Sequence, residues 1–259
     1  MSILTVKNLT KAFGGLIANS DISMDVKKGS ITAVIGPNGA GKTTFFNMIT
    51  GVYQPTSGDI ELNGKSIVGL KPHAVSAKGI SRTFQNIRLF GSMTVLENVM
   101  VGMHNHIKQG LLGAVLDLPS FKKQESFAEQ EAYNILDYIG LSQFTNEEAR
   151  NLSYGAQRRL EIGRALATRP QILLLDEPAA GMNPKETKEL TELIFKMRNE
   201  FGLTIVLIEH DMKLVMEISE HIIVLDHGEK IAEGIPEEIR TNQKVIEAYL
   251  GKSGAETVS

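Results

Sequence analysis

The stretch G-P-N-G-A-G-K-T-T, residues 36–44, decides the fold of this chain. It fits the pattern G-x-x-x-x-G-K-[ST], and it follows S-I-T-A-V-I, residues 30–35, an apolar and β-branched run that predicts a buried strand. A loop of this kind offers a concave row of backbone N–H groups, which suits the anionic oxygens of a triphosphate. The stretch therefore predicts a nucleoside triphosphate site between a strand and a helix.

Each residue type in this loop has a chemical reason to be there. Gly36, Gly39 and Gly41 can take positive φ, so the backbone can wrap the β-phosphate, while a helix starting near Lys42 points its positive end at the same oxygens. The Lys42 ammonium neutralises β and γ charge, and the Thr43 hydroxyl is placed to bind Mg²⁺. We expect the nucleotide to contact the whole loop, which consists of Gly36, Pro37, Asn38, Gly39, Ala40, Gly41, Lys42, Thr43 and Thr44.

The composition gives no overall bias toward nucleic acid or anionic lipid. The 259 residues include 27 Lys plus Arg against 30 Asp plus Glu, a net charge of −3, so partners must be recognised by local surfaces. There are no cysteines, which excludes disulfides and thiolate metal sites. The N-terminus lacks the apolar region of a signal peptide, and the longest apolar runs are too short to span a bilayer. We expect the chain to be soluble and cytoplasmic.

The order of the predicted elements indicates one α/β domain with subdomains. Short strands with turn residues between them fill the first part, and Ala128, Ala132 and Leu136 mark an amphipathic helix in the middle. Strands alternate with helices beyond Pro170, which predicts parallel strands with helical crossovers. We expect a single domain at 1–251, with its core at about 1–88 and 160–251, a helical subdomain at about 89–159 containing an irregular insertion from His104 to Ser120, and a flexible tail at 252–259.

The second chemical signal is I-L-L-L-D-E-P, residues 172–178. Four apolar residues predict a fully buried strand, and two carboxylates follow where it ends, at the carboxyl edge of the sheet where open α/β folds bind ligands. We expect Asp176 to hold Mg²⁺, directly or through water, and Glu177 to polarise the water that attacks the γ-phosphoryl group. A pair of surface acids after a core strand is the alternative, and the phosphate loop upstream argues against it.

Residues 151–165 read N-L-S-Y-G-A-Q-R-R-L-E-I-G-R-A, which resembles the L-S-G-G-Q signature of ABC-type ATPases. The phosphate loop, this signature and the D-E-P strand stand in the order that distinguishes the ABC class from kinases and small GTPases. We expect Ser153 to cap a helix and to form, with the free N–H groups near Gly155, a second anion site. In ABC ATPases that site serves the γ-phosphate held by the other subunit. Tyr154 and Ala156 depart from the pattern, whereas Ser153 and Gly155 are kept, so we expect the contact across the dimer to survive.

Single residues match the rest of the ABC pattern. His210 matches the switch histidine at the γ-phosphate, Gln85 matches the glutamine that links the magnesium site to the helical subdomain, and Phe13 matches the aromatic residue that stacks on adenine. Each also has an ordinary reading, as a polar loop residue, an exposed glutamine or a core phenylalanine. Asn183 stands where ABC ATPases commonly have Asp, so the sequence does not decide whether the cross-dimer contact at this position forms. The resemblance implies catalytic Glu177, His210 and Lys42, nucleotide contacts from Phe13, Gln85, Ser153, Gly155 and the loop, and metal contacts from Thr43, Gln85 and Asp176.

The pair His104 and His106 is interpreted as part of a solvated loop. No cysteine is available to complete a metal site and the surrounding segment is polar, so no zinc is predicted.

The resemblance extends over nearly the whole chain and becomes specific to one branch of the ABC class. The chain looks like the ATP-binding subunit of high-affinity branched-chain amino acid importers, the LivG type. The segments that carry the likeness are F-G-G-L at 13–16, R-T-F-Q-N-I-R-L-F at 82–90, M-T-V-L-E-N at 93–98, E-P-A-A-G-M-N-P-K-E-T at 177–187, I-E-H-D-M-K-L-V-M at 208–216 and A-Y-L-G at 248–251.

This resemblance implies an assembly around the membrane. Its members work with two permease subunits, a second ATPase subunit that is either another copy or a related chain, and indirectly a substrate-binding protein; ATP and Mg²⁺ are the cofactors. The chain would then lie on the inner face of the cell membrane, docked on the permeases through a surface that includes residues 85–93. Two alternatives stay open. Relatives with the same 177–187 stretch serve urea or short amides, and soluble ABC ATPases act on DNA, ribosomes or Fe–S assembly, although their fused domains, coiled-coil insertion or basic surface are not seen here.

Overall fold

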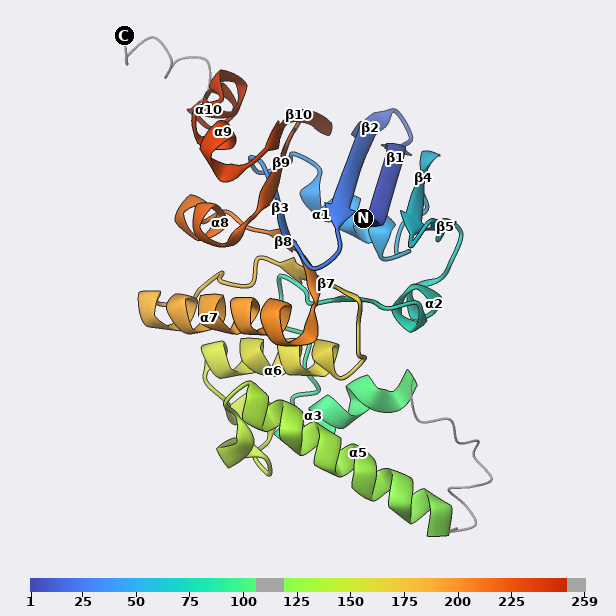
Figure 1. The fold of residues 1–259 in the computed structure, drawn as a ribbon, viewed down its shortest axis with the longest axis vertical. Helices are drawn as coiled ribbons and strands as arrows, with labels where there is room; N and C mark the ends of the chain where they lie inside the picture. The colour runs from blue at the N-terminus through green and yellow to red at the C-terminus, as the bar shows by residue number, and fades with distance from the viewer. Residues whose placement is uncertain (106–118, 251–259) are drawn as a thin grey trace.

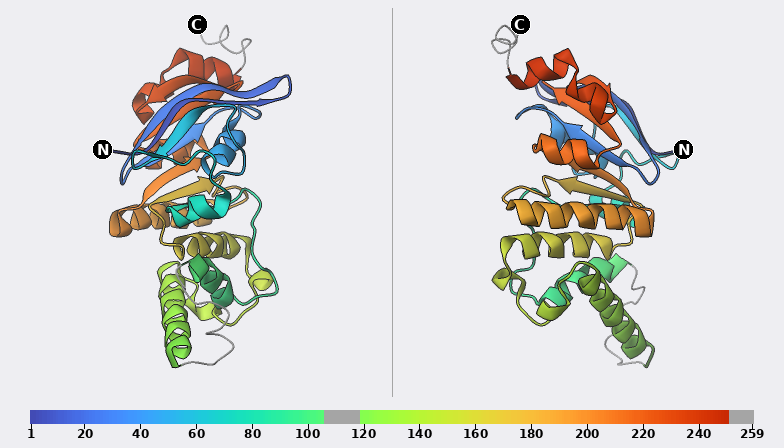
Figure 2. Two further views of the ribbon diagram at one scale, coloured as in Figure 1. Left: turned by 90° about the vertical axis from the view of Figure 1, so that its right-hand side faces the viewer. Right: turned by 60° about the vertical axis from the view of Figure 1, so that its left-hand side comes forward.

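The structure, a computed structural model, describes residues 1–105 and 119–250 (Figure 1). The insertion expected at residues 104–120 lies mostly outside these ranges, and the tail expected at 252–259 lies wholly outside them. The described part forms two sheets with helices around them. Helices α3 (Val95–Gly102) and α5 (Pro119–Tyr138) lie at one end of the molecule, away from both sheets (Figure 1, Figure 2).

The larger sheet is mostly parallel, as the alternation beyond Pro170 predicts. Its strand order is β10-β9-β3-β8-β7-β6, and within it only the described pair β9 and β10 is antiparallel. All residues of β3, β7 and β8 are buried because both faces of the sheet are covered, which explains their uninterrupted apolar sequences. The six strands are β3 (Ile31–Ile35), β6 (Ile80–Arg82), β7 (Ile172–Asp176), β8 (Thr204–Ile208), β9 (His221–Asp226) and β10 (Glu229–Gly234).

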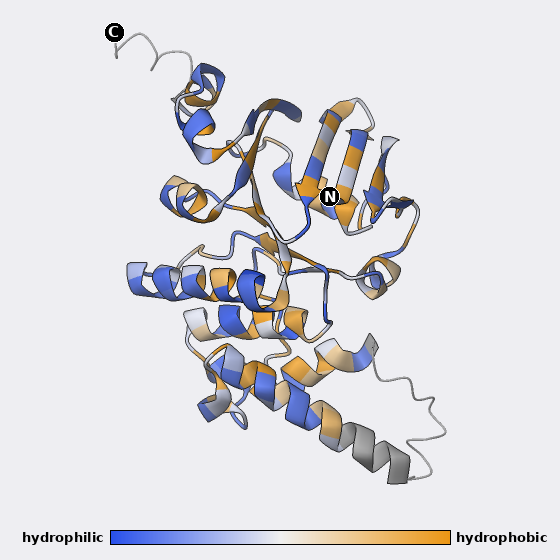
Figure 3. Cartoon of the chain, in the orientation of Figure 1, coloured by the Kyte–Doolittle hydropathy of each residue, from blue (hydrophilic) through white to orange (hydrophobic). Residues whose placement is uncertain are grey.

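The smaller sheet is antiparallel, with the order β2-β1-β4-β5. It has one buried face, so side chains alternate along its strands: in β2, Ile22, Met24 and Val26 are buried while Asp25 and Lys27 are exposed. The same alternation appears as orange and blue bands on β1 and β2 in Figure 3. Its strands are β1 (Ser2–Phe13), β2 (Leu16–Lys27), β4 (Ser57–Leu62) and β5 (Lys65–Ser66).

Two clusters of buried side chains form the described core, one on each face of the larger sheet. Leu173 and Leu175 of β7 face the cluster that contains helices α6 (Tyr154–Leu166), α7 (Pro184–Phe201) and α8 (Met212–Ile218), whereas Ile172 and Leu174 face the cluster that contains α1 (Lys42–Ile49) and the antiparallel sheet. The remaining helices are α2 (Pro72–Ala77), α9 (Pro236–Arg240) and α10 (Gln243–Leu250), with short 3-10 turns at Met103–Asn105, Ser142–Phe144 and Ala149–Asn151.

The helical end packs onto α6. Ala128, Ala132 and Leu136 of α5 are buried with Val95 and Val99 of α3, so the amphipathic helix predicted for this segment is confirmed. They belong to the same cluster as the side chains of α6 and of one sheet face, so the core runs from the sheet through α6 into this end. Within residues 1–105 and 119–250, no helix is both long enough and apolar enough to cross a membrane.

Candidate active site

The phosphate loop links the end of β3 to the start of α1, and its glycines have the positive φ that the sequence predicts. Gly36, Gly39 and Gly41 have φ of 150°, 81° and 94°. A Cβ on Gly36 would lie 2.0 Å from the Leu225 carbonyl oxygen, and one on Gly41 would lie 2.5 Å from the Ala18 carbonyl oxygen. Glycine is therefore required at both positions, because neighbouring backbone comes within contact of the loop.

A cavity of about 480 Å³ opens beside this loop. The Lys42 side chain, at its edge, donates from Nζ to the carbonyl oxygens of Gly36 (2.7 Å) and Pro37 (2.9 Å). Burial lowers the pKa of Lys42, while the nearby charges of Glu177 and Asp176 raise it. The lining residues are Leu16, Ile17, Ala18, Asn38, Gly39, Ala40, Gly41, Lys42, Thr43, Thr44, Gln85, Glu177, His210 and His227.

The side chains of Gln85 and His210, from separate loops, both contact the Glu177 carboxylate on the wall of this cavity. Gln85 Nε2 donates to Glu177 Oε2 at 2.8 Å, and His210 Nε2 lies 2.8 Å from Glu177 Oε1. Glu177 follows β7 with φ of 47°, and its N–H donates to the Ile208 carbonyl of β8. This arrangement brings Glu177 and His210, which the sequence assigned to the γ-phosphate, together with Gln85, which it assigned to the magnesium site. It leaves a carboxylate beside the phosphate loop, with a side chain that is 15% exposed.

Asp176, the predicted magnesium residue, is buried at the end of β7. Its Oδ2 accepts a hydrogen bond from Arg82 Nη2 at 2.5 Å, and its Oδ1 is buried with no hydrogen-bond partner in the described residues. An unsatisfied carboxylate oxygen in this position fits a bound cation or its water shell. Arg82, which the sequence did not single out, also donates from Nη1 to Asn47 of α1 at 2.6 Å and so ties β6, β7 and α1 together.

Ser153 caps α6, as the sequence predicts. Its Oγ accepts from the Ala156 N–H at 3.4 Å. Gly155 lies close to α7, since a Cβ there would stand 2.6 Å from Glu186 Oε1. Neither Ser153 nor Gly155 is among the described residues that line the cavity at the phosphate loop, so these two residues lie apart from that cavity within one copy of the chain.

The residues that depart from the ABC pattern have local structural roles. The Tyr154 hydroxyl accepts from Arg158 Nη2 at 3.2 Å. Ala156 is buried. Asn183 caps α7, where its Oδ1 accepts from the N–H groups of residues 185 and 186. An aspartate would cap this helix equally well, so the Asn183 departure does not disturb the fold.

Phe13 lies at the end of β1, outside the set of described residues that line the cavity. Its ring packs edge-on against Tyr53 with centroids 5.3 Å apart, and Lys11 Nζ is 4.9 Å from its centroid. The apolar wall nearest the loop comes instead from Leu16 and Ile17, which start β2. Among the described residues there is no group of three or more His, Asp or Glu arranged to hold a metal ion; His104 is described and His106 is not.

Several buried charges near the site were not singled out from the sequence. Glu209 accepts from the N–H groups of Ala179 (2.8 Å) and His210 (3.0 Å), which joins two loops at the site. Arg158 of α6 donates to the Gln85 carbonyl oxygen, and Glu161 of α6 accepts from the Arg88 N–H. Their spacing of three places them on one helix face, which sequence reasoning could have noticed, but their burial depends on distant segments.

Together, the loop, the grouped carboxylate and the buried aspartate define a phosphate-loop nucleoside triphosphatase on an α/β fold. The family model described as ABC transporter matches residues 19–180, and one described as branched-chain amino acid ATP-binding cassette transporter matches residues 229–255. The chain therefore belongs to the ABC transporter family of ATPases, in the LivG type that the sequence resembles.

Individual relatives agree with this placement. The chain is 51% identical, over 97% of its length and 98% of theirs, to the high-affinity branched-chain amino acid transport ATP-binding proteins BraF of Pseudomonas aeruginosa and LivG of Escherichia coli. Among solved structures, a nucleotide-free ATP-binding cassette from an ABC transporter matches with a TM-score of 0.85 and 35% identity, covering 97% of this chain and all of the other. The ATP-binding cassette MJ0796, a dimer bound to ADP and Pi, matches with a TM-score of 0.76 and 27% identity, covering 90% of this chain and 98% of the other.

Proposed function

We propose that this chain is the ATP-hydrolysing subunit of a membrane importer for branched-chain amino acids. One observation carries the hydrolytic part: the Glu177 carboxylate stands beside the phosphate loop, between Gln85 and His210. The transport part is supported by the names of the relatives and by the match of the C-terminal family model.

The hydrolytic step follows from the positions of these side chains. The loop N–H groups and Lys42 bind the β- and γ-phosphates of ATP. The oxygen of the attacking water bonds to the γ-phosphorus while Glu177 accepts a proton from that water. The bond from the γ-phosphorus to the bridging oxygen breaks, which releases ADP and phosphate. Gln85 and His210 hold the Glu177 carboxylate in place by their hydrogen bonds.

Thr43 and Asp176, with Gln85, would hold Mg²⁺. The buried Asp176 Oδ1 is the atom that fits this role best, because it has no partner among the described residues. A bound Mg²⁺ supplies positive charge that offsets the charge of the phosphate oxygens. Phe13 would stack on adenine, which requires its ring to reach the base from the end of β1.

A complete site requires two ATPase subunits. Ser153 and Gly155 lie at the start of α6 and not beside the phosphate loop of the same chain, so they would contact the γ-phosphate held by a second subunit. We propose that ATP binding closes this pair of ATPase subunits on two permease subunits. The chain would then lie in the cytoplasm, on the inner face of the membrane. A substrate-binding protein would deliver the substrate to the permease subunits. The proposed division is a core at about 1–88 and 160–251 with a helical subdomain at about 89–159.

The partners test this proposal. Tagged Glu177→Gln protein, which should trap the closed pair, is added with Mg-ATP to detergent-solubilised membranes of the source cell, and the captured proteins are identified by mass spectrometry. Permease subunits and a second ATPase, or a second copy of this chain, support the proposal. Capture of ribosomes or nucleic acid without permeases would contradict it and would favour a soluble ABC ATPase. An untagged Glu177→Gln sample serves as the control.

A further inference from the structure

The segment 84–88, which contains Gln85, is bound to α6 by two buried charged side chains of that helix. The side chains of Arg158 and Glu161 are 0% and 1% exposed and form an ion pair, with Arg158 Nη1 3.1 Å from Glu161 Oε2. Nothing in the hydrolytic step described above uses either residue. Buried ion pairs are costly unless their remaining hydrogen bonds are satisfied, so their partners show what they hold.

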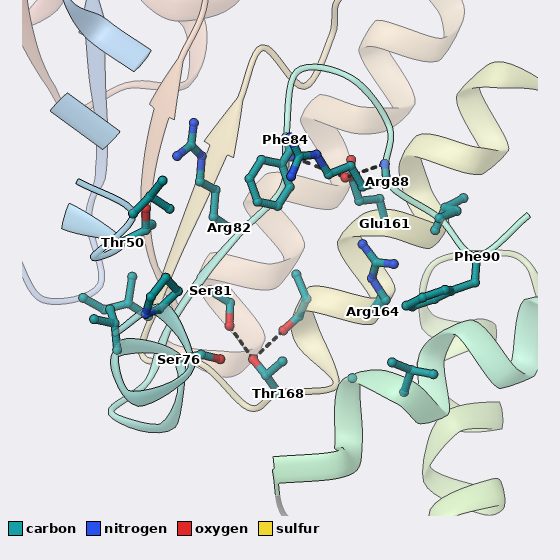
Figure 4. Close-up of a pocket in the computed structure, with 18 residues that line it drawn as sticks. Thr50, Ser76, Ser81, Arg82, Phe84, Arg88, Phe90, Glu161, Arg164 and Thr168 are labelled. Atoms are coloured by element: carbon teal, nitrogen blue, oxygen red, sulfur yellow. Dashed lines mark hydrogen bonds between the residues drawn. The ribbon is translucent and has the colours of Figure 1, made fainter. Parts of the chain in front are cut away.

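Those partners are backbone atoms of the Gln85 segment. Arg158 donates from Nη1 to the Phe84 carbonyl oxygen at 2.6 Å and from Nη2 to the Gln85 carbonyl oxygen at 2.8 Å. Glu161 Oε1 accepts from the N–H groups of Phe84 (3.3 Å) and Arg88 (3.2 Å). Figure 4 shows Glu161 beside Phe84 and Arg88 on the wall of a second cavity of about 710 Å³.

Four hydrogen bonds between one helix and three residues of the segment 84–88 fix both the position and the direction of the segment. Charge-assisted bonds of this kind are stronger than neutral ones, and a planar guanidinium sets the orientation of the two carbonyls it binds. Gln85 is thereby held twice: its carbonyl by Arg158 and its side-chain amide by Glu177. A shift of α6 would therefore move the Gln85 amide relative to the carboxylate.

The same helix begins at the second anion site. Ser153 is the N-cap of α6, and Arg158 also donates to the hydroxyl of Tyr154, the first residue of the helix. The start of α6 and the Gln85 segment are thus connected through one buried side chain.

We infer that Arg158 and Glu161 are positioning residues that hold Gln85 against Glu177 and couple the position of α6, with its anion site, to the contact between Gln85 and the hydrolytic carboxylate. This inference rests on the proposed role of Glu177. It assigns to the pair a place in the reaction, beyond a contribution to the stability of the fold.

A double-mutant cycle between Arg158 and Gln85 tests the inference. Arg158→Lys keeps the charge, but one ammonium nitrogen replaces the two guanidinium nitrogens that bind the Phe84 and Gln85 carbonyls, so the planar fork that orients them is lost. We expect Arg158→Lys to slow single-turnover ATP hydrolysis by about 10- to 100-fold, the effect of a small misplacement, with the Kd for ATP unchanged. In a Gln85→Ala background the same change should slow hydrolysis by less than about twofold, because the group through which it acts is gone. Losses that multiply in the double variant, or a normal rate in Arg158→Lys, would overturn the inference.

Two further variants keep the test decisive. If thermal unfolding shows that Arg158→Lys does not fold, the cycle is run with Glu161→Gln, which keeps an oxygen for the backbone N–H groups, and the same non-additivity is expected. Arg169→Gln, which breaks an exposed pair with Glu131, is the matched control and should leave the rate unchanged. Glu177→Gln separates the two claims: if it hydrolyses ATP normally the proposed function fails, whereas if it is inactive and the Arg158 losses multiply, only this inference fails.

Discussion

Replacing Glu177 by Gln removes the proton acceptor of the proposed reaction and little else. The amide has the shape of the carboxylate, and its oxygen can still accept from Gln85 Nε2, which lies 2.8 Å from Glu177 Oε2. No cavity forms, and the phosphate loop and Lys42 are untouched. We therefore expect the Kd for ATP to be unchanged.

The expected loss in rate follows from the role of the group. A positioned general base contributes about 10²- to 10⁴-fold to a rate, which corresponds to about 2.7–5.5 kcal/mol of activation free energy. Single-turnover hydrolysis of labelled ATP, at protein concentrations where the wild type is active, measures the rate, and an equilibrium titration measures binding. The matched control is Glu192→Gln on α7, whose side chain is 67% exposed and which should hydrolyse ATP normally. A Glu177→Gln rate within about tenfold of wild type would refute the assignment of the base.

Three further results are expected. Lys42→Ala should weaken ATP binding by about 3 kcal/mol, or about 100-fold in Kd, because hydrogen bonds from the ammonium to phosphate are lost; an unchanged Kd in a titration would contradict the phosphate-loop assignment. Ser153→Arg should leave ATP binding intact and stop hydrolysis, and normal turnover where the wild type dimerises would show that the altered signature is not used. For Glu209, burial raises the pKa above 4.5, so the folded state binds the proton more tightly and the stability that this group contributes falls as pH rises through that range. The free energy of unfolding in urea, wild type minus Glu209→Gln, should therefore decrease as the pH rises above 4.5, and a constant difference would refute the shift.

The parts of the site that follow strands could be predicted from the sequence. The phosphate loop has a local pattern, and Glu177 and His210 come directly after apolar runs that form parallel strands. Because the carboxyl ends of parallel strands share one edge, these residues had to lie near the loop. The Ser153 cap was predictable for a different reason, since capping depends only on the chain within a few residues.

The buried charges could not be predicted in this way. Arg82 binds Asp176, which lies ninety-four positions further along the chain. Arg158 binds carbonyl oxygens of residues more than seventy positions earlier. Their patterns in the sequence are those of ordinary strand and helix residues with solvated charges. The packing of Phe13 on Tyr53 likewise depends on the meeting of β1 with a later loop, which a motif does not encode.

Leucine uptake by the reconstituted complex tests whether this chain drives the import of branched-chain amino acids. The chain, its captured permeases, the second ATPase and the substrate-binding protein are placed in proteoliposomes, with ATP supplied on the side of the ATPase subunits. The account predicts ATP-dependent uptake of leucine, isoleucine or valine that disappears in the Glu177→Gln complex. ATP-dependent uptake of urea or a short amide, without uptake of these amino acids, would contradict it.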